Sequence, residues 1–165
     1  MTEYRRAHLP GATWFFTVNL AERHGNRLLT ARIDALRAAF RYVRQRHPFR
    51  IDAVVVLPDH LHCIWTLPPG DAAYGKRWNV LKGHFSRAIE QGERVSQSRS
   101  RRRERGIWQR RFWEHLIRDR EDFNRHVDYI HWNPVKHGWV ETAADWPHSS
   151  FHDYVSKGLY PVDWG

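Results

Sequence analysis

The chain has 165 residues, enough for one packed domain, and its composition, 41% hydrophobic and 14% aromatic, excludes a disordered protein. With 27 lysines and arginines against 18 acidic residues, its formal net charge of +9 favours a polyanionic partner; a basic soluble protein without such a partner is the alternative. The single cysteine excludes an intrachain disulfide, and no apolar run is long enough for a signal core or a membrane span, so we expect one cytoplasmic domain over residues 1–165.

The first two predicted elements are a strand and a helix. Residues 13–20 (TWFFTVNL) follow a Pro-Gly turn signal and have the composition of a strand. Residues 29–46 carry apolar side chains at helical spacing, with Thr30 as the expected N-cap and Pro48 as a stop signal. The pattern predicts an amphipathic helix with an arginine-rich outer face.

The next two elements are expected to form an antiparallel hairpin. Residues 49–57 include the run AVVVL, which is apolar on both faces and suits a central strand. Residues 61–67 form the second strand, and Pro58 and Asp59 supply the turn between the two.

Three more elements complete the pattern. Residues 78–90 have apolar positions three and four apart and predict a second helix, and residues 107–118 (IWQRRFWEHLIR) predict a fourth strand. A third helix is expected over residues 121–132, ended by Asn133 and Pro134. The order βαββαβ followed by a helix is the ferredoxin-like α+β arrangement.

Residues 92–106 (GERVSQSRSRRRERG) interrupt this pattern between the second helix and the fourth strand. They contain six arginines and almost nothing apolar, so the segment buries too little surface to fold by itself. We expect a flexible basic loop. It either follows a phosphate backbone and orders on binding, or it is a solvated insertion.

Two histidines, His60 and His62, occupy alternate positions at the start of a predicted buried strand. Residues two apart on a strand point to the same face, so both imidazoles can approach one point, while Leu61 and Cys63 face the other layer. This geometry suits a shared metal ion. A pair of hydrogen-bonded core histidines is the alternative interpretation.

The third predicted helix offers further site residues. Beside its apolar stripe, an adjacent stripe carries polar and aromatic side chains, namely Asp122, His126, Tyr129 and Asn133. An amide oxygen from Asn133, added to two imidazoles, gives an incomplete metal shell with room for water and a phosphate oxygen. Tyr129, one turn from Asn133, is then either a nucleophile or an ordinary half-buried aromatic.

Four stretches together carry a resemblance to a known family. They are the N-terminal Tyr-Arg-Arg with WFFTVNL, the triplet His60-Leu61-His62, WQRRFWEH at residues 108–115, and HVDYIHWNPVKHGWV at residues 126–140. In this order and spacing, the chain resembles the REP-associated tyrosine transposases, a bacterial branch of the IS200-like, single-tyrosine HUH transposases. The resemblance runs from residue 4 to residue 164, apart from the arginine-rich segment.

The resemblance implies a ferredoxin-like HUH nuclease fold whose additional C-terminal helix carries the nucleophilic tyrosine. Such proteins bind single-stranded DNA with repetitive extragenic palindromes (REP elements) and cleave it near the foot of the hairpin. By motif, Tyr129 is then the catalytic nucleophile, and His60, His62 and Asn133 hold Mg²⁺ or Mn²⁺. Many related transposases have glutamine where this chain has Asn133, and the shorter side chain reduces its reach toward the metal.

The implied chemistry is transesterification. Tyr129 would attack the scissile phosphorus, form a 5′-phosphotyrosine and release a 3′-hydroxyl, and the reverse attack would rejoin strands without ATP. A free tyrosine has a pKa of about 10, so at neutral pH the nucleophile needs positive charge or a base nearby. His126 and Asp122 are candidates for that base by helical spacing.

Several regions are expected to bind DNA. The resemblance implies that the N-terminal segment reads a short single-stranded sequence beside the hairpin, and cations and aromatics on the fourth strand suit backbone and base contacts. Packing in the core is the alternative for Trp113, and simple solvation is the alternative for the cations of the second helix. The candidates are Tyr4, Arg5, Arg6, Lys82, Arg87, Arg110, Arg111, Trp113, His115, Arg118 and Lys136.

Two alternatives to a tyrosine strand transferase stay open. One is a palindrome-binding DNA module without catalysis, and the other is a nuclease in which a metal-activated water attacks while Tyr129 only packs. The resemblance also implies a bacterial, nucleoid-associated protein in the cytoplasm. It implies a monomer, although mobile relatives form dimers that exchange active-site helices.

Overall fold

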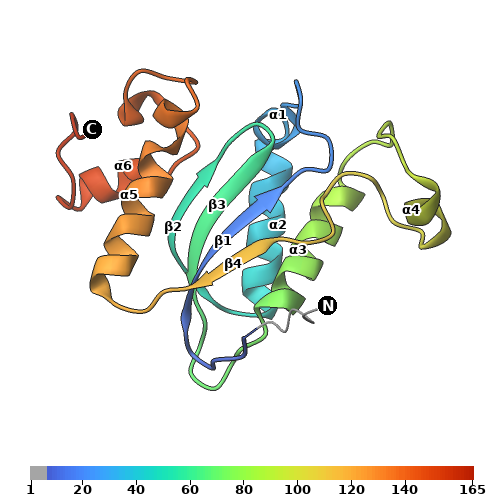
Figure 1. Ribbon diagram of the computed structural model, residues 1–165, viewed down its shortest axis with the longest axis horizontal. Helices are drawn as coiled ribbons and strands as arrows, with labels where there is room; N and C mark the ends of the chain where they lie inside the picture. Colours follow the sequence, from blue (N-terminus) through green and yellow to red (C-terminus); the bar gives the residue numbers. More distant parts are fainter. Residues whose placement is uncertain (1–6) are drawn as a thin grey trace, which may run out of the picture.

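The computed structural model describes residues 7–165 and has one four-stranded sheet with helices on both faces (Figure 1). In chain order the elements are β1 (Thr13–Asn19), α1 (Leu28–Ala31), α2 (Ile33–Arg46), β2 (Arg50–Val56), β3 (His60–Thr66), α3 (Tyr74–Arg87), α4 (Gln97–Arg101), β4 (Trp113–Leu116), α5 (Arg120–Lys136), the 3-10 helix η1 (Ala143–Asp145) and α6 (Phe151–Ser156). The α+β class predicted from the sequence is confirmed.

The strands lie in the order β2-β3-β1-β4, and each neighbouring pair is antiparallel. The central strands β1 and β3 pair along their full length, from Thr13 opposite Thr66 to Asn19 opposite His60. β2 and β3 form the predicted hairpin. The two central strands are not consecutive in the chain, and the order β2-β3-β1-β4 is that of the ferredoxin-like arrangement.

Helices α2 and α3 cover one face of the sheet (Figure 1). Phe16 of β1 and Leu61, Cys63 and Trp65 of β3 point into this layer, where the Trp65 ring stacks on Trp78 of α3 with centroids 4.2 Å apart. Burying one large apolar side chain stabilises a fold by about 1.5–3 kcal/mol. This aromatic layer therefore holds the two central strands in place.

Helix α5 lies on the opposite face. Phe15 of β1 and Ile64 of β3 pack there against Val127 and Ile130 of α5. Side chains alternate along a strand, so every second residue of β3 before Ile64 also faces α5. The strand positions that precede Ile64 by two and four residues are the two histidines singled out in the sequence.

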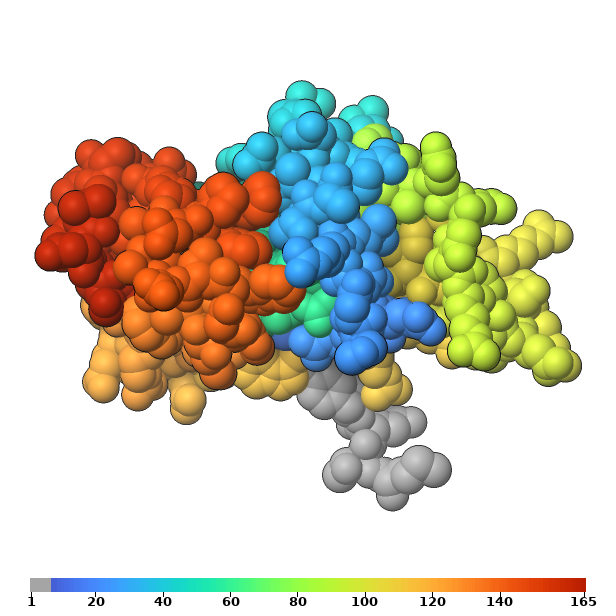
Figure 2. Space-filling view, turned by 90° about the horizontal axis from the view of Figure 1, so that it is seen from above, coloured from blue at the N-terminus to red at the C-terminus, as the bar shows by residue number. Residues whose placement is uncertain are grey.

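The C-terminal segment packs beside α5, at the end of the molecule opposite α4 (orange and red against yellow in Figure 2). Trp146 Nε1 donates a hydrogen bond to the Val56 carbonyl at 3.0 Å, and His131 Nε2 lies 2.8 Å from Ser150 Oγ. These contacts tie the segment to both β2 and α5. Among the described residues no helix has the length and apolar character needed to cross a bilayer.

Two predicted helices differ from the observed ones. The expected helix over residues 29–46 is split into α1 and α2, because Arg32, with φ −117° and ψ 40°, leaves the helical conformation. Thr30 is not an N-cap, since it lies inside α1 and its hydroxyl donates to a backbone carbonyl three residues earlier. α3 covers residues 74–87 rather than the expected 78–90.

The fourth strand is shorter than predicted, covering four residues instead of residues 107–118. Leu20, just after β1, pairs with Trp108, whereas Thr17 pairs with Trp113, so three steps along one side correspond to five steps along the other. The two extra residues leave the ladder and the strand bulges there.

Arg110 and Arg111, which were expected on the fourth strand, therefore lie in this bulge. The Arg110 side chain turns toward the arginine-rich segment, where Nε donates to Glu104 at 2.8 Å and Nη2 to Ser98 at 3.0 Å. The bulge and the arginine-rich segment are thus linked.

The arginine-rich segment over residues 92–106 contains the short helix α4. Arg105 connects the segment to the end of α3: it pairs with Glu93 at 2.5 Å and donates to the Ile89 carbonyl at 2.7 Å. Gly106 allows a close approach, because an added Cβ would lie 2.2 Å from the Arg94 carbonyl oxygen. The segment is thus closed at its base, and its flexibility stays a prediction.

Helix α5 does not end at Asn133 and Pro134 as predicted, but continues to Lys136. Proline removes one helical hydrogen bond, but the helical pattern continues past it, because the backbone N–H of His137 donates to the Asn133 carbonyl at 3.0 Å. The added residues bring Lys136 close to Tyr129.

Candidate active site

His60 and His62 lie side by side on β3, under α5. Each is 4% exposed, and their ring centroids are 5.0 Å apart. In the sheet, His60 pairs with Asn19 and His62 with Thr17. The structure brings the two imidazoles together on one face, as expected of alternate residues on a strand.

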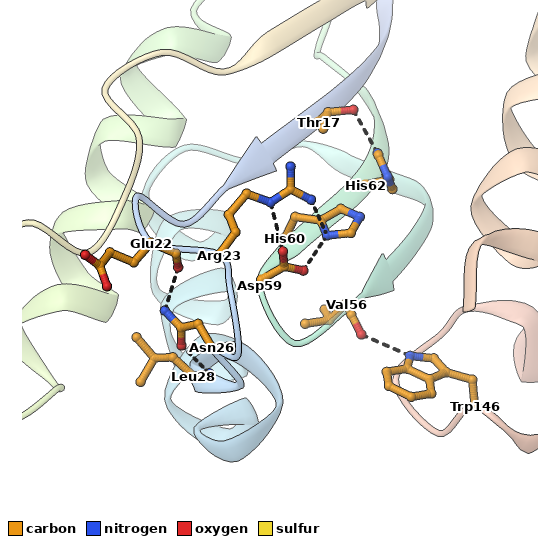
Figure 3. Close-up of polar contacts among 10 residues, drawn as sticks. All are labelled: Thr17, Glu22, Arg23, Asn26, Leu28, Val56, Asp59, His60, His62 and Trp146. Atoms are coloured by element: carbon orange, nitrogen blue, oxygen red, sulfur yellow. Dashed lines mark hydrogen bonds and ion pairs between the residues drawn. The ribbon is translucent and has the colours of Figure 1, made fainter. Parts of the chain in front are cut away.

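Both imidazoles are held through Nδ1 (Figure 3). Thr17 Oγ1 lies 2.8 Å from His62 Nδ1, and Asp59 Oδ1 lies 2.7 Å from His60 Nδ1. Arg23 fixes Asp59 in turn, because its Nε donates to Oδ2 at 2.8 Å. With Nδ1 engaged, Nε2 is the nitrogen of each ring that is left for a ligand, and metal-binding histidines are held in this way.

Burial keeps both imidazoles neutral. It lowers the pKa of His62 to about 3, with a further contribution from His60. Burial also lowers the pKa of His60, although the hydrogen bond to Asp59 opposes the shift. Since a neutral imidazole is the form that binds a metal ion, both rings are ready to act as ligands at neutral pH.

Asn133 reaches the pair of histidines from α5 and is 0% exposed. Its amide raises the pKa of His60, yet neither Oδ1 nor Nδ2 has a hydrogen-bond partner of normal geometry among the described residues. An unpaired buried polar group costs about 1–3 kcal/mol, so the position favours a bound group. An amide oxygen is a ligand that Mg²⁺ and Mn²⁺ take, and neutral imidazoles bind divalent transition metals, so the three side chains together could hold a divalent metal ion.

Tyr129 stands one turn before Asn133 on α5, next to the histidines. Its ring centroid is 5.2 Å from that of His62, and the residue is 37% exposed. Lys136 Nζ lies 4.7 Å from the centroid of the tyrosine ring. A tyrosine that is open to solvent and flanked by a cation and by candidate metal ligands has the surroundings that a nucleophile needs.

His137 also belongs to the site, although the sequence-based interpretation does not include it. Its ring centroid is 5.3 Å from that of His60. The spacing of four residues from Tyr129 to Asn133 continues to His137, which is a signal in the sequence. An expected helix end at Pro134 conceals this signal, because the spacing has meaning only if the helix continues.

A second cluster, formed by His115, Asp122 and His126, joins β4 to α5. Buried Asp122 accepts hydrogen bonds from His115 Nε2 and from the backbone N–H of Arg118, both at 2.9 Å. His126 Nδ1 lies 2.8 Å from the Asp122 carbonyl oxygen. The three residues could offer ligand atoms within 4.8 Å of one another, but these atoms are already bonded among themselves, and we interpret the cluster as a tie between elements.

The hydrogen bonds of this cluster show which of the two candidate proton acceptors, Asp122 or His126, is the better base for Tyr129. Burial would raise the pKa of Asp122, but the bonds from Arg118 and His115 outweigh it and hold the pKa at about 2. A carboxylate with so low a pKa is a weak base. His126 lines the same pocket as Tyr129 and is the better placed of the two.

Comparisons with known proteins agree with this site. The family model described as "Transposase IS200 like" matches residues 17–133, a range that starts at Thr17 and ends at Asn133. A REP-associated tyrosine transposase of Escherichia coli (strain K12) is 50% identical over 164 residues, which are 99% of this chain and 91% of the relative. The chain belongs to the REP-associated tyrosine transposases, within the IS200-like family.

Two further likenesses cover the whole chain of this transposase. A relative from Haemophilus influenzae is 45% identical over 166 residues, covering 100% of this chain and 94% of its own length. The solved structure of a REP-associated tyrosine transposase bound to a REP hairpin has a TM-score of 0.87 and 50% identity, and the match covers 100% of this chain and 92% of that one. As a member of a transposase family, the protein is an enzyme that acts on DNA.

Some of the expected DNA-binding residues of the transposase lie near Tyr129. Trp113 and His115 are on β4, and the Trp113 side chain is not packed in the core but 56% exposed. Arg118 is exposed in the turn between β4 and α5, and Lys136 is exposed at the end of α5. Trp113 lines the same pocket as Tyr129, and Lys136 Nζ lies over the tyrosine ring, whereas Arg118 lines a different pocket.

Other candidates lie elsewhere. Lys82 and Arg87 lie on α3, across the sheet from α5, and Lys82 Nζ donates to the Gln109 carbonyl at 3.0 Å. Arg110 and Arg111 are exposed in the bulge before β4. The N-terminal candidates, residues 4–6, lie outside the described residues.

Proposed function

We propose that this transposase cleaves and rejoins single-stranded DNA at REP hairpins through a covalent bond to Tyr129. The observation that carries the proposal is the pair of imidazoles, each held through Nδ1, with the ring of His62 5.2 Å from that of Tyr129. The 50% identical relative bound to a REP hairpin supports the choice of DNA.

Three residues would hold a divalent metal, Mg²⁺ or Mn²⁺: His60 and His62 through Nε2, and Asn133 through its amide oxygen. When bound, the ion would polarise the scissile phosphate and stabilise its developing charge. The unpaired Asn133 amide and the low pKa of His62 support this assignment.

The chain's own residues would carry out the transfer. The Tyr129 oxygen forms a bond to phosphorus as the bond from phosphorus to the 3′ oxygen breaks. The tyrosine proton leaves to a base, and the released 3′ oxygen takes up a proton to become a hydroxyl. The ammonium of Lys136, 4.7 Å from the tyrosine ring centroid, favours both a developing phenolate and an approaching phosphate.

One chain supplies every residue of this proposed site, because both histidines are on β3 and the tyrosine and asparagine are on α5 of the same molecule. Exchange of helices between two copies is not needed to complete it. We therefore infer that the monomer is the active form.

The test is a denaturing gel of protein incubated with labelled single-stranded DNA that carries a REP hairpin and its flanking nucleotides. With Mg²⁺ or Mn²⁺ we expect a slow-migrating protein–DNA adduct, which chelator removes. Tyr129→Phe should abolish the adduct while hairpin binding stays within a few-fold of that of the unmodified protein. Tyr42→Phe is the matched control, because Tyr42 lies on α2 and stacks on His84, away from the site.

Other outcomes would point to other functions. Cleavage without an adduct, in both the unmodified protein and Tyr129→Phe, would indicate attack by a metal-activated water. Tight hairpin binding without cleavage at any metal concentration would indicate a binding module without catalysis.

A further inference from the structure

An open pocket of about 550 Å³ lies directly beside Tyr129. Its walls come from β1, β3, β4 and α5, and the residues that line it are Phe15, Thr17, His62, Trp113, Arg125, His126 and Tyr129. The volume is within the range of small-molecule sites. Because one wall is the proposed nucleophile, whatever enters this pocket sits next to the reacting phosphate.

The pocket is aromatic and is built on the sheet. Buried Phe15 forms its floor, with its ring centroid 5.9 Å from that of Trp113 and 4.7 Å from that of His126. Trp113 is the exposed wall, with 56% of its surface open to solvent. An indole fixed on a strand and open on one side offers a flat surface for stacking.

One edge of the pocket is polar and is also held in place. His126 Nδ1 is engaged by the Asp122 carbonyl oxygen at 2.8 Å, and its ring stacks on His115 with centroids 4.6 Å apart. The Nε2 atom of His126 is therefore the one available to a ligand. Arg125 lies at the rim, with 64% of its side chain exposed and its guanidinium 3.5 Å from the Asp122 carboxylate.

We propose that this pocket binds the unpaired base of a nucleotide that flanks the scissile phosphate, by stacking it on Trp113. This inference rests on the proposed attack by Tyr129, because that attack places the flanking nucleotides at the pocket. A nucleobase has a flat π-face for the indole and hydrogen-bonding edges for His126, and its phosphates suit Arg125.

The base has to be unpaired and unstacked to use this site. In a duplex both faces of each base are covered by its neighbours, so no face is free for an indole. The single-stranded nucleotides next to a hairpin have no such constraint. The pocket would therefore select for cleavage outside the duplex and hold the phosphate in register with Tyr129.

The experiment compares oligonucleotides that carry the REP hairpin and have an abasic site at either position next to the cleaved bond. With the unmodified protein, one of the two abasic substrates should form adduct more slowly, on the order of tenfold, as expected for the loss of one stacked base. Trp113→Ala should form adduct with the intact substrate more slowly by a similar factor, and the abasic site should change the rate of this variant little. Trp113→Phe should keep most of the rate of adduct formation. Trp132→Ala removes a different exposed tryptophan, one that lies on α5 rather than β4, and should behave as the unmodified protein.

A second readout does not require cleavage. A hairpin oligonucleotide with 2-aminopurine placed in turn at each unpaired position beside the hairpin foot is bound to Tyr129→Phe. We expect strong quenching at one position, lost in Tyr129→Phe/Trp113→Ala and kept in Tyr129→Phe/Trp132→Ala. If no position depends on Trp113, the pocket proposal is wrong even when the adduct forms. If the unmodified protein forms no adduct but the quenching depends on Trp113, the pocket stands and the cleavage proposal fails.

Discussion

The ring orientation of each candidate metal ligand, His60 and His62, is fixed by a hydrogen bond at its Nδ1 atom. His62 is held by a neutral hydroxyl, that of Thr17, on the neighbouring strand, whereas His60 is held by the Asp59 carboxylate. A ligand histidine without a partner on its second nitrogen loses its fixed tautomer and ring orientation. If these histidines hold a metal as proposed, their partners should affect its affinity without being ligands themselves.

Thr17→Val tests this role at the scale of one atom. Valine matches the shape of threonine but cannot bond to His62 Nδ1, so we expect about 10–100-fold weaker Mn²⁺ binding. Thr17→Ser keeps the hydroxyl and should bind as the unmodified protein does. Calorimetric titration with Mn²⁺ measures the affinity, and thermal unfolding checks that both variants are folded. Equal affinities in the valine and serine variants would show that Thr17 does not position the ligand.

The sequence predicts some of these residues and not others, for a physical reason. His60 and His62, or Tyr129 and Asn133, are related by the period of one element, so spacing alone places them on one face. Thr17 faces His62 only through the pairing of β1 with β3, and that register has no local signal in the chain. Partners from another strand become visible only in the folded structure.

At the scale of elements, the sequence predicts α5 correctly except for its C-terminal end. Its polar and apolar stripes are correct, but Pro134 is tolerated in the last turn, and the helix end is therefore wrong by several residues. β4 fails for another reason: its composition is strand-like throughout, yet adjacent Ile107 and Trp108 are both buried in the same layer, which breaks the alternation of a strand.

The attachment of α5 to the C-terminal segment should weaken in acid. His131 of α5 is 0% exposed, and burial, with a contribution from His152, lowers its pKa to about 4. In the unfolded chain the pKa is about 6.5, so as the pH falls the unfolded state takes up the proton first. Stability is therefore full above pH 6.5 and falls as the pH drops toward 4, by up to about 3 kcal/mol from this residue.

His131→Gln provides the test of that pH dependence. Glutamine keeps a donor for Ser150 but does not titrate, so the stability advantage of the unmodified protein should shrink between pH 6.5 and 4. Urea unfolding at several pH values measures the difference, with His24→Gln, an exposed histidine, as the control. Parallel stability curves for the unmodified protein and His131→Gln would contradict this account.

At the scale of the molecule, the proposed active site and the arginine-rich segment are two distinct regions that could each contact DNA. The proposed active site lies between the sheet and α5, whereas the arginine-rich segment projects at the other end of the molecule, beyond α3 (Figures 1 and 2). The net charge of +9 predicts binding to a polyanion but not which surface is used. Some arginines of the segment hold its own structure, as Arg105 does by its hydrogen bond near the end of α3. Others can therefore be replaced to test DNA binding without disturbing the fold of the segment.

If the arginine-rich segment follows the phosphate backbone, its exposed arginines should contribute to the salt dependence of DNA binding. Arg101 and Arg102 are exposed, and replacing them leaves the anchoring bonds of Arg105 intact, which a deletion of the segment would not. Each lost phosphate contact lowers the slope of log K against log salt by about 0.7–0.9, so Arg101→Gln/Arg102→Gln should flatten it by about 1.5. Arg37→Gln/Arg41→Gln removes the same charge from α2, away from the arginine-rich segment, and should change the slope much less. Binding of the REP hairpin measured by fluorescence anisotropy at increasing salt gives both slopes, and equal slopes would show that the segment is a solvated insertion.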